Sequence, residues 1–282
     1  MMNLTDVGVI RSICTKHGFE LSKGFGQNFI VNAGICPKIV TASGITSDWG
    51  VIEVGPGIGV LTAELAKTAK KVVAVEVDKR LPAVLAETLS EFSNVEIVLE
   101  DILKCDIAGM LRDKFADMPV AVCANLPYYI TSPIIMRLLE ERLPIESITV
   151  MVQKEAATRI CALPGTREAG AISYAVHYYA KPEVLFNVQP GSFYPPPKVT
   201  SAVIRLSLHK EPPVTPKDEK LMFRVIHAAF GQRRKTAANA ISAGLGMEKA
   251  RVLNALDACG MLLTVRPEQL TLAQYSALSD IL

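Results

Sequence analysis

Short apolar runs alternate with helical patterns of apolar residues along the first two thirds of the chain. The runs are rich in valine and isoleucine, which is typical of strands buried in a parallel sheet. They predict strands at residues 51–54, 71–77, 95–99, 120–124 and 148–152. The helical patterns fall at residues 5–17, 60–69, 79–89, 131–142 and 154–161. This alternation predicts a doubly wound α/β sheet.

Two later segments, 183–188 and 202–208, alternate apolar and polar residues without a helical pattern between them. This favours antiparallel strands that close the sheet. A proline-rich stretch at 210–216 then predicts a linker, and residues 217–282 show helical spacing of apolar side chains. We therefore expect an α/β domain over residues 1–209 and a small all-helical domain after the linker.

Composition narrows the class of protein. The chain has 282 residues, of which 50% are hydrophobic and 21% charged, enough to bury a large core and a small one. The net charge of +2 means that nucleic-acid binding must be argued from where the charges lie. The six cysteines are scattered without a Cys-x-x-Cys pair, so we expect neither metal nor disulfides, and a reducing cytoplasm. No stretch approaches the ~20 apolar residues of a membrane helix, so we expect no membrane association.

Polar groups follow the predicted strands at the sheet edge where ligands bind in such folds. The turn Gly55–Gly59 lets the backbone approach a ligand and leads into the N-terminus of a helix. Its glycine spacing departs from the dinucleotide fingerprint, because Val60 stands where the third glycine belongs. Glu76 could accept hydrogen bonds from ribose hydroxyls, and Asp101 from an adenine amino group. The alternatives are a solvated charge and a turn cap, respectively.

The strand at 120–124 runs directly into Asn125-Leu126-Pro127-Tyr128-Tyr129. The amide oxygen of Asn125 and the carbonyl of Leu126 can accept the two hydrogens of an exocyclic amine, while the Tyr128 ring stacks on its base. An Asx-type turn with a packed tyrosine is the alternative. Farther on, three prolines stiffen the loop around Phe193, which is either a core anchor or a stacking platform.

The helical region contains a basic run, Arg233-Arg234-Lys235, which is suited to binding phosphate. A solvated surface is the alternative for so short a run. Near the amino end, the glycine-rich stretch 23–30 contains amide side chains among aromatic ones, and a solvated loop is its alternative.

Taken together, these motifs resemble the ribosomal RNA small-subunit adenine dimethyltransferase family, whose nearest relatives are the erythromycin-resistance rRNA methylases. The resemblance is carried, in chain order, by Gly26-Gln27-Asn28-Phe29, Glu53–Gly59, Glu76, Asp101, Asn125–Tyr128, Phe193-x-Pro195-x-Pro197-Lys198-Val199 and Phe230-Gly231-Gln232-Arg233-Arg234-Lys235. Phe25 and Ile30 stand where the family more often has leucine, and Asn32 stands where aspartate is usual.

The resemblance implies a class I S-adenosylmethionine methyltransferase fold with a helical carboxyl-terminal domain, and S-adenosylmethionine as the cofactor. It implies a cofactor site formed by Asn28, Ile30, Gly55, Gly57, Glu76, Asp101 and Asn125. The catalytic residues it implies are Asn125, Leu126, Pro127, Tyr128 and Phe193, with the two aromatic rings enclosing the target adenine. The RNA-binding residues are Lys198, Arg233, Arg234 and Lys235.

The implied activity is methylation of N6 on two adjacent adenosines in a 3′-terminal hairpin loop of 16S rRNA in the 30S particle. A 23S rRNA methylase of the resistance type is the alternative, and the full match over Phe230–Lys235 favours the small subunit. A binding-only protein on this fold would need a damaged site, and the glycine spacing disfavours a nicotinamide-dependent dehydrogenase. We expect a monomer.

Overall fold

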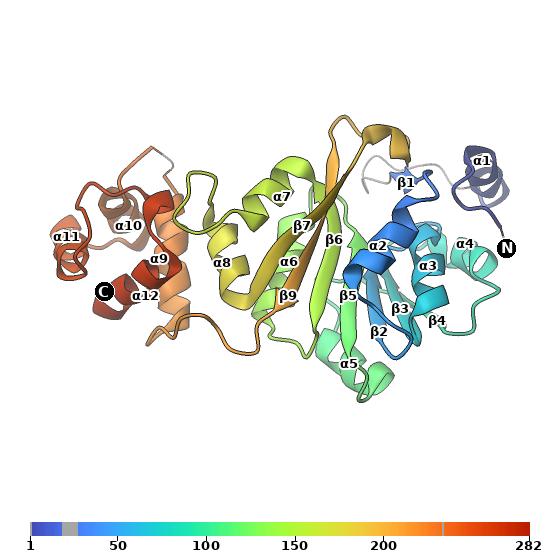
Figure 1. Cartoon of the computed structure of the whole chain (residues 1–282), viewed down its shortest axis with the longest axis horizontal. Coiled ribbons are helices and arrows are strands. Elements are labelled where there is room, and N and C mark those ends of the chain that lie inside the picture. Colours follow the sequence, from blue (N-terminus) through green and yellow to red (C-terminus); the bar gives the residue numbers. More distant parts are fainter. Residues whose placement is uncertain (1, 19–27, 233) are drawn as a thin grey trace. The chain divides into compact units, whose positions relative to one another are not determined.

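The computed structural model describes residues 2–18, 28–232 and 234–282 (Figure 1). The chain forms two compact units, each described by itself below. The first contains Met1–Ala157 and Glu183–Leu208, and the second contains Thr158–Pro182 and His209–Leu282. None of the helices in the described ranges is long and apolar enough to span a membrane.

The first unit is organised by a seven-stranded sheet with the order β4-β3-β2-β5-β6-β9-β7. Its parallel strands are β4 (Val95–Leu99), β3 (Lys71–Glu76), β2 (Gly50–Val54), β5 (Val120–Asn125) and β6 (Ser147–Gln153). The strand β9 (Ser201–Leu208) runs antiparallel to β6, and β7 (Ala180–Val188) forms the edge. The predicted doubly wound sheet with an antiparallel closing strand is therefore confirmed.

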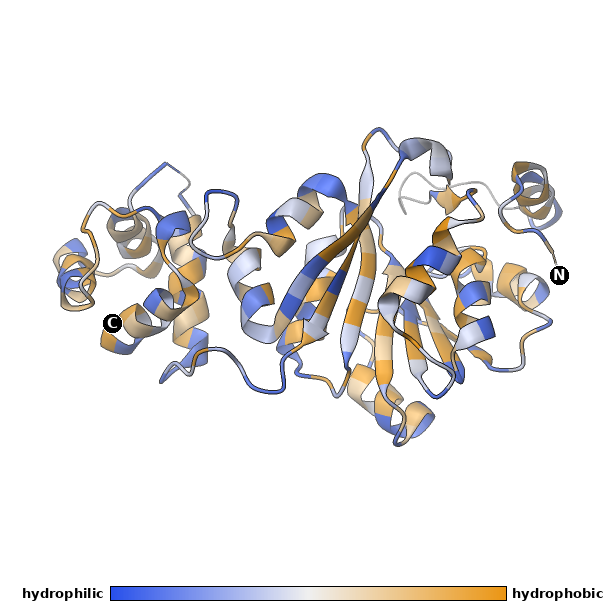
Figure 2. Ribbon diagram, viewed as in Figure 1, coloured by the Kyte–Doolittle hydropathy of each residue, from blue (hydrophilic) through white to orange (hydrophobic). Residues whose placement is uncertain are grey.

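Burial explains why the strand patterns differ. The inner strand β5 is buried along nearly its whole length, whereas the edge strand β7 mixes buried and exposed positions. Figure 2 shows the same contrast, since the parallel strands carry much more apolar colour than β7. A strand covered on both faces must be apolar throughout, while an edge strand need not be.

The helices of the first unit are α1 (Val7–Lys16), α2 (Ile35–Ser43), α3 (Val60–Thr68), α4 (Leu81–Thr88), α5 (Ile107–Phe115) and α6 (Thr131–Glu140), and α7 (Lys154–Cys161) continues into the second unit. The carboxylate of Asp6 caps α1 by accepting a hydrogen bond from the Val9 N–H at 3.0 Å. The sequence pattern did not predict α2 and α5. Pro37 and Gly109, which lie inside them, weaken a helical pattern.

A second, two-stranded sheet holds the amino-terminal segment in place. Its strands β1 (Phe29–Ile30) and β8 (Phe193–Tyr194) are antiparallel, with Ile30 opposite Phe193. The short helix η2 (Pro190–Ser192) precedes β8, and the carbonyl of its last residue accepts a hydrogen bond from the Val31 N–H at 2.8 Å. Segments more than 160 residues apart in the chain are thereby joined beside the parallel strands.

The second unit is mostly helical. It contains α8 (Ala171–Tyr179), α9 (Glu219–Phe230), α10 (Ala237–Leu245), α11 (Lys249–Ala258), η3 (Pro267–Gln269) and α12 (Leu272–Ile281). Its core includes Tyr174, whose hydroxyl donates to the Leu270 carbonyl at 2.6 Å and whose ring centroid lies 5.0 Å from that of Tyr275. Because Tyr174 and Tyr178 pack into this core, residues 158–182 group with the helices and not with the sheet. The sequence had placed them in the first domain.

Candidate active site

A pocket in the first unit lies at the carboxyl ends of β2, β3, β4 and β5. It is lined by every residue predicted for the cofactor: Asn28, Ile30, Gly55, Gly57, Glu76, Asp101 and Asn125. It is also lined by four of the five predicted catalytic residues: Asn125, Leu126, Pro127 and Tyr128. Parallel strands bring their carboxyl ends to one edge, so residues scattered over a hundred positions meet in one cavity.

The glycine turn between β2 and α3 lines this pocket through Gly55, Pro56 and Gly57. Gly57 and Gly59 have φ values of 60° and 91°, in the left-handed region that favours glycine. A Cβ atom on Gly57 would lie 3.1 Å from the Phe29 ring, and one on Gly59 would lie 3.0 Å from the Leu89 side chain. These two glycines therefore leave no room for a side chain, whereas a Cβ atom on Gly55, which lines the pocket at a φ of 69°, would have no atom within 4 Å.

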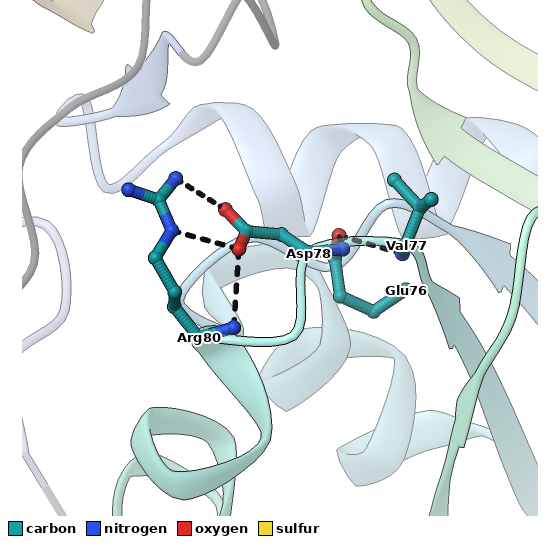
Figure 3. A network of polar contacts seen from close by, with 4 residues as sticks. All are labelled: Glu76, Val77, Asp78 and Arg80. Carbon is teal, nitrogen blue, oxygen red and sulfur yellow. Dashed lines mark hydrogen bonds and ion pairs between the residues drawn. The ribbon is translucent and has the colours of Figure 1, made fainter.

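At the end of β3, the Glu76 carboxylate is fixed by its own backbone (Figure 3). Its Oε1 atom accepts hydrogen bonds from the N–H groups of Val77 and Asp78, both at 2.8 Å. The Asp78 carboxylate in turn accepts from Arg80, through Nε at 2.8 Å and Nη2 at 2.6 Å. Burial raises the pKa of Glu76, and the two backbone N–H groups lower it. A carboxylate held this way keeps acceptor positions for ribose hydroxyls.

Glu53 is a further acid of the pocket wall, for which the sequence assigned no role. Its side chain is 1% exposed in the apolar strand β2, and its Oε2 atom has no hydrogen-bond partner among the described residues. Burial raises the pKa of Glu53 to about 8, while the neighbouring Thr62 lowers it and Glu76 raises it. A buried carboxyl with an unused acceptor suits a positively charged ligand group. The signal in the sequence is an acid inside an otherwise apolar strand.

Asp101 follows β4 and is half-buried in the pocket wall. Its Oδ1 atom accepts a hydrogen bond from the Leu103 N–H at 3.0 Å, so it also caps the turn as the alternative interpretation proposed. Arg137 holds the same turn by donating to the carbonyls of Ile102 and Cys105, the latter at 2.6 Å. No motif predicts this support, because Arg137 lies in α6, 35 residues beyond Ile102.

Asn125 ends β5 with its side chain oriented by the amino-terminal segment. Its Nδ2 atom donates to the Asn28 carbonyl at 3.3 Å, which leaves the amide oxygen as the group that can accept from a ligand. The following N–H, of Leu126, donates to the Met151 carbonyl of β6 at 3.2 Å. The start of the Asn-Leu-Pro-Tyr turn is therefore attached both to the sheet and to the segment that leads into β1.

The aromatic residues near the pocket have different environments. Tyr128 is half-buried and its hydroxyl lies 2.7 Å from Ser201 Oγ. Tyr129, to which the sequence assigned no role, lines the pocket and is 64% exposed. Phe193 is 3% exposed, packs in the core with Phe29, and is not among the lining residues. Of the two interpretations left open for Phe193, this conformation favours the core anchor.

The predicted RNA-binding residues that the structure describes lie on the surface of their units. Arg234 and Lys235 are exposed between α9 and α10, and Lys198 is exposed after β8 in the first unit. Arg233 lies outside the described residues, as do residues 26–27, the first half of the predicted amino-terminal motif.

Comparisons with known proteins agree with this architecture. The family model for ribosomal RNA adenine dimethylase matches residues 18–281. The chain is 47% identical over 273 residues to the ribosomal RNA small subunit methyltransferase A of Lachnoclostridium phytofermentans, covering 96% of this chain and 94% of that one. It is also 47% identical over 279 residues to the protein of that name from Geobacillus thermodenitrificans, covering 98% and 95%.

Two solved structures have the same fold over most of the chain. A dimethyladenosine transferase from Plasmodium falciparum matches with a TM-score of 0.71 and 26% identity, over 89% of this chain and 95% of that one. The 23S rRNA methyltransferase ErmE matches with a TM-score of 0.68 and 27% identity, over 90% and 99%. The methyltransferase fold expected from the sequence motifs is thereby confirmed.

Proposed function

Because the chain belongs to the ribosomal RNA adenine dimethylase family, we propose that it dimethylates N6 of two adjacent adenosines in a 3′-terminal hairpin loop of 16S rRNA. The substrate is the 30S particle and the methyl donor is S-adenosylmethionine. The observation that carries this proposal is the pocket that joins Asn125–Tyr128 to Glu76 and Asp101. The names of relatives at 47% identity support the small subunit over the 23S alternative.

The pocket residues fit S-adenosylmethionine. The fixed Glu76 carboxylate can accept from the ribose hydroxyls, and Asp101 can accept from the adenine amino group. The unused acceptor of Glu53 suits the positive charge that this cofactor carries. When bound, the cofactor supplies a methyl group activated by its positively charged sulfur.

Asn125 and Leu126 act on the nitrogen that receives the methyl group. The lone pair of an adenine amino group is delocalised into the ring, so catalysis must localise it on N6 and direct it at the methyl carbon. The Asn125 amide oxygen and the Leu126 carbonyl accept the two N6–H hydrogens and thereby orient this lone pair. One of these hydrogens leaves as a proton after the new N–C bond forms.

Tyr128 stabilises the adenine outside its stack. Moving a base out of the stack of its neighbours costs a few kcal/mol of free energy. Stacking the base on an aromatic side chain offsets roughly 1 to 3 kcal/mol of this cost. Tyr128 lines the pocket beside Asn125. Phe193 supports the wall from the core by its pairing with Ile30, and the exposed ring of Tyr129 offers a second aromatic face at the pocket.

Lys198 and the basic run 233–235 contact phosphates of the RNA. Exposed cations suit this task, because attraction to phosphate needs charge more than fixed geometry. We further propose that the enzyme acts as a monomer in the cytoplasm, where ribosomal subunits are assembled.

The test is methyl transfer from labelled S-adenosylmethionine to separated 30S and 50S subunits from cells that lack this activity. We expect N6,N6-dimethyladenosine in the 30S fraction alone. Label in 50S would support the resistance-type alternative. Label in neither fraction would contradict both and direct attention to small-molecule acceptors or a binding-only role.

A further inference from the structure

We propose that Ser201 is a positioning residue for Tyr128, holding the aromatic ring in the orientation in which it stacks on the target adenine. The inference rests on the proposed function, because it takes Tyr128 as the ring that receives the base. It assigns a role to a residue outside the motifs that identify the family, on the antiparallel strand β9.

The geometry that carries the inference is a single polar contact at the far end of the tyrosine. The Tyr128 hydroxyl and Ser201 Oγ are 2.7 Å apart, a normal distance for a hydrogen bond between two hydroxyl groups. A tyrosine side chain has two rotatable bonds, and the Cα atom fixes one end of the ring. The hydroxyl oxygen lies on the axis of the outer of these bonds. A hydrogen bond there therefore holds the long axis of the ring in place, while the packing of the half-buried ring limits its rotation about that axis.

Ser201 is itself firmly placed. It is fully buried and is the first residue of β9, opposite Gln153 in the antiparallel pair with β6. Just before it, the Thr200 carbonyl accepts a hydrogen bond from the Lys154 N–H at 3.0 Å. The serine hydroxyl is thus held at the end of a strand that is hydrogen-bonded along its length to β6.

Burial raises the pKa of Tyr128, and the contact with Ser201 lowers it. The phenol therefore keeps its proton at physiological pH, and either hydroxyl can donate this hydrogen bond. Because the half-buried ring also lines the pocket, the same side chain is anchored at its hydroxyl and available to a ligand along its face. This arrangement gives a stacking surface that is oriented before the base arrives, which lowers the entropy lost on forming the reactive complex.

The expected effect of losing the contact is on the catalytic step. A net hydrogen bond of about 1 kcal/mol corresponds to roughly a fivefold change. We expect Ser201→Ala to lower kcat about fivefold on 30S subunits, because fewer bound complexes hold the adenine correctly. The KM for 30S should stay within twofold, since it depends mainly on contacts with RNA phosphates. The Kd for S-adenosylmethionine should also stay within twofold, since the other pocket residues bind the cofactor.

A double-mutant cycle tests whether the two hydroxyls act through each other. Tyr128→Phe keeps the ring and removes the same hydrogen bond, so it should lower kcat as much as Ser201→Ala does. The double variant should be no slower than either single variant. Ser201→Thr retains the hydroxyl and should restore most of the rate. Tyr128→Phe also keeps the test valid if Ser201→Ala lowers stability, because it leaves the buried serine in place.

Ser147→Ala is the matched control. It removes another buried serine hydroxyl from the same sheet, one that has no hydrogen-bond partner among the described residues, and should leave kcat unchanged. Wild-type kcat in Ser201→Ala, or losses that multiply in the double variant, would overturn the inference. The wild-type assay on 30S and 50S decides the proposed function separately, and the variants are measured on whichever subunit it methylates.

Discussion

The pocket of the first unit and the basic run of the second unit differ in how firmly their side chains are held. In the pocket, Glu76 and Asn125 are each held by hydrogen bonds to backbone atoms at the ends of buried strands. In the basic run, Arg234 and Lys235 are exposed on a connection between two helices. Transfer of a methyl group requires reacting atoms to be placed within a few tenths of an ångström, so its residues must be fixed. Attraction to phosphate acts over about 10 Å and tolerates movement.

This difference predicts which measured quantity each substitution should change. Changes in the pocket should affect rate or cofactor affinity and be insensitive to salt. Changes in the basic run should affect RNA affinity and its salt dependence, and leave the chemistry intact. The following substitutions test this separation.

Asn125→Ala should have the largest effect. It removes the acceptor for one N6–H hydrogen, and we expect the methylation rate to fall by at least about 1,000-fold. Affinity for S-adenosylmethionine, measured by calorimetry, should change only a few fold. Undiminished turnover would show that Asn125 is not a catalytic residue. A loss of cofactor affinity as large as the loss of rate would show that Asn125 acts mainly by binding the cofactor.

Reversing the charge of Arg233 and Arg234 to glutamate should weaken 30S binding by about 100-fold near 0.1 M salt. The slope of log K against log salt should become shallower by roughly 1.5, because two phosphate contacts are lost. Filter binding at several salt concentrations measures both. Reversal of Lys220 and Lys249, exposed lysines of the same unit, gives the same change in net charge and should leave the slope nearly unchanged. An unchanged slope in the Arg233 and Arg234 variant would favour the alternative interpretation, in which the basic run is a solvated surface that does not bind phosphate.

The buried carboxyl group of Glu53 should make the stability of the folded protein depend on pH. Its pKa is raised from an ordinary value of 4.5 to about 8, so the folded protein binds this proton more tightly than the unfolded chain does. The free energy of unfolding should therefore fall as pH rises through that window, by about 3 kcal/mol between pH 5.5 and pH 8. Glu53→Gln should remove this pH dependence. Urea unfolding without cofactor at pH 5.5 and pH 8 measures it, and an equal slope in both proteins would contradict the assignment.

Arg137→Gln should have the smallest effect. It removes the donors that hold the turn after Asp101, so the KM for S-adenosylmethionine should rise about threefold with kcat nearly unchanged. Arg112→Gln is the control, because the bond described for Arg112 goes to its neighbour Asp113 on an exposed surface. A loss of kcat without a change in KM would show that the turn serves the chemistry instead.

The pocket could be predicted because strand ends are a local property of the sequence. Apolar runs locate the strands, parallel pairing brings their ends together, and the polar residues that follow must then meet. The motifs around Asn125 and Gly55 identified the family, which the comparisons confirm. The residues that support the pocket could not be predicted. Ser201 contacts Tyr128, and Arg137 contacts the turn after Asp101, only because folding brings distant segments together, and neither residue belongs to a recognised motif.

The remaining differences also arise from long-range packing. Phe193 is buried because β8 pairs with β1, and no local pattern indicates that pairing. Residues 158–182 group with the helical unit because Tyr174 and Tyr178 pack into its core, where Tyr178 also donates a hydrogen bond to Glu219 at 2.8 Å. For the basic run, the sequence predicted a charged surface, and the structure describes Arg234 and Lys235 as exposed.

The pairing of β1 with β8 has a consequence for synthesis of the protein. Ile30 leaves the ribosome early, but the strand with which it pairs is made more than 160 residues later. Contacts so distant in sequence form late, because the loop between them must first be ordered. The nascent chain can therefore build its parallel strands before it can retain a cofactor. Binding competence comes only when residues 193–194 have emerged, so the first part of the pocket to be translated is the last to be secured.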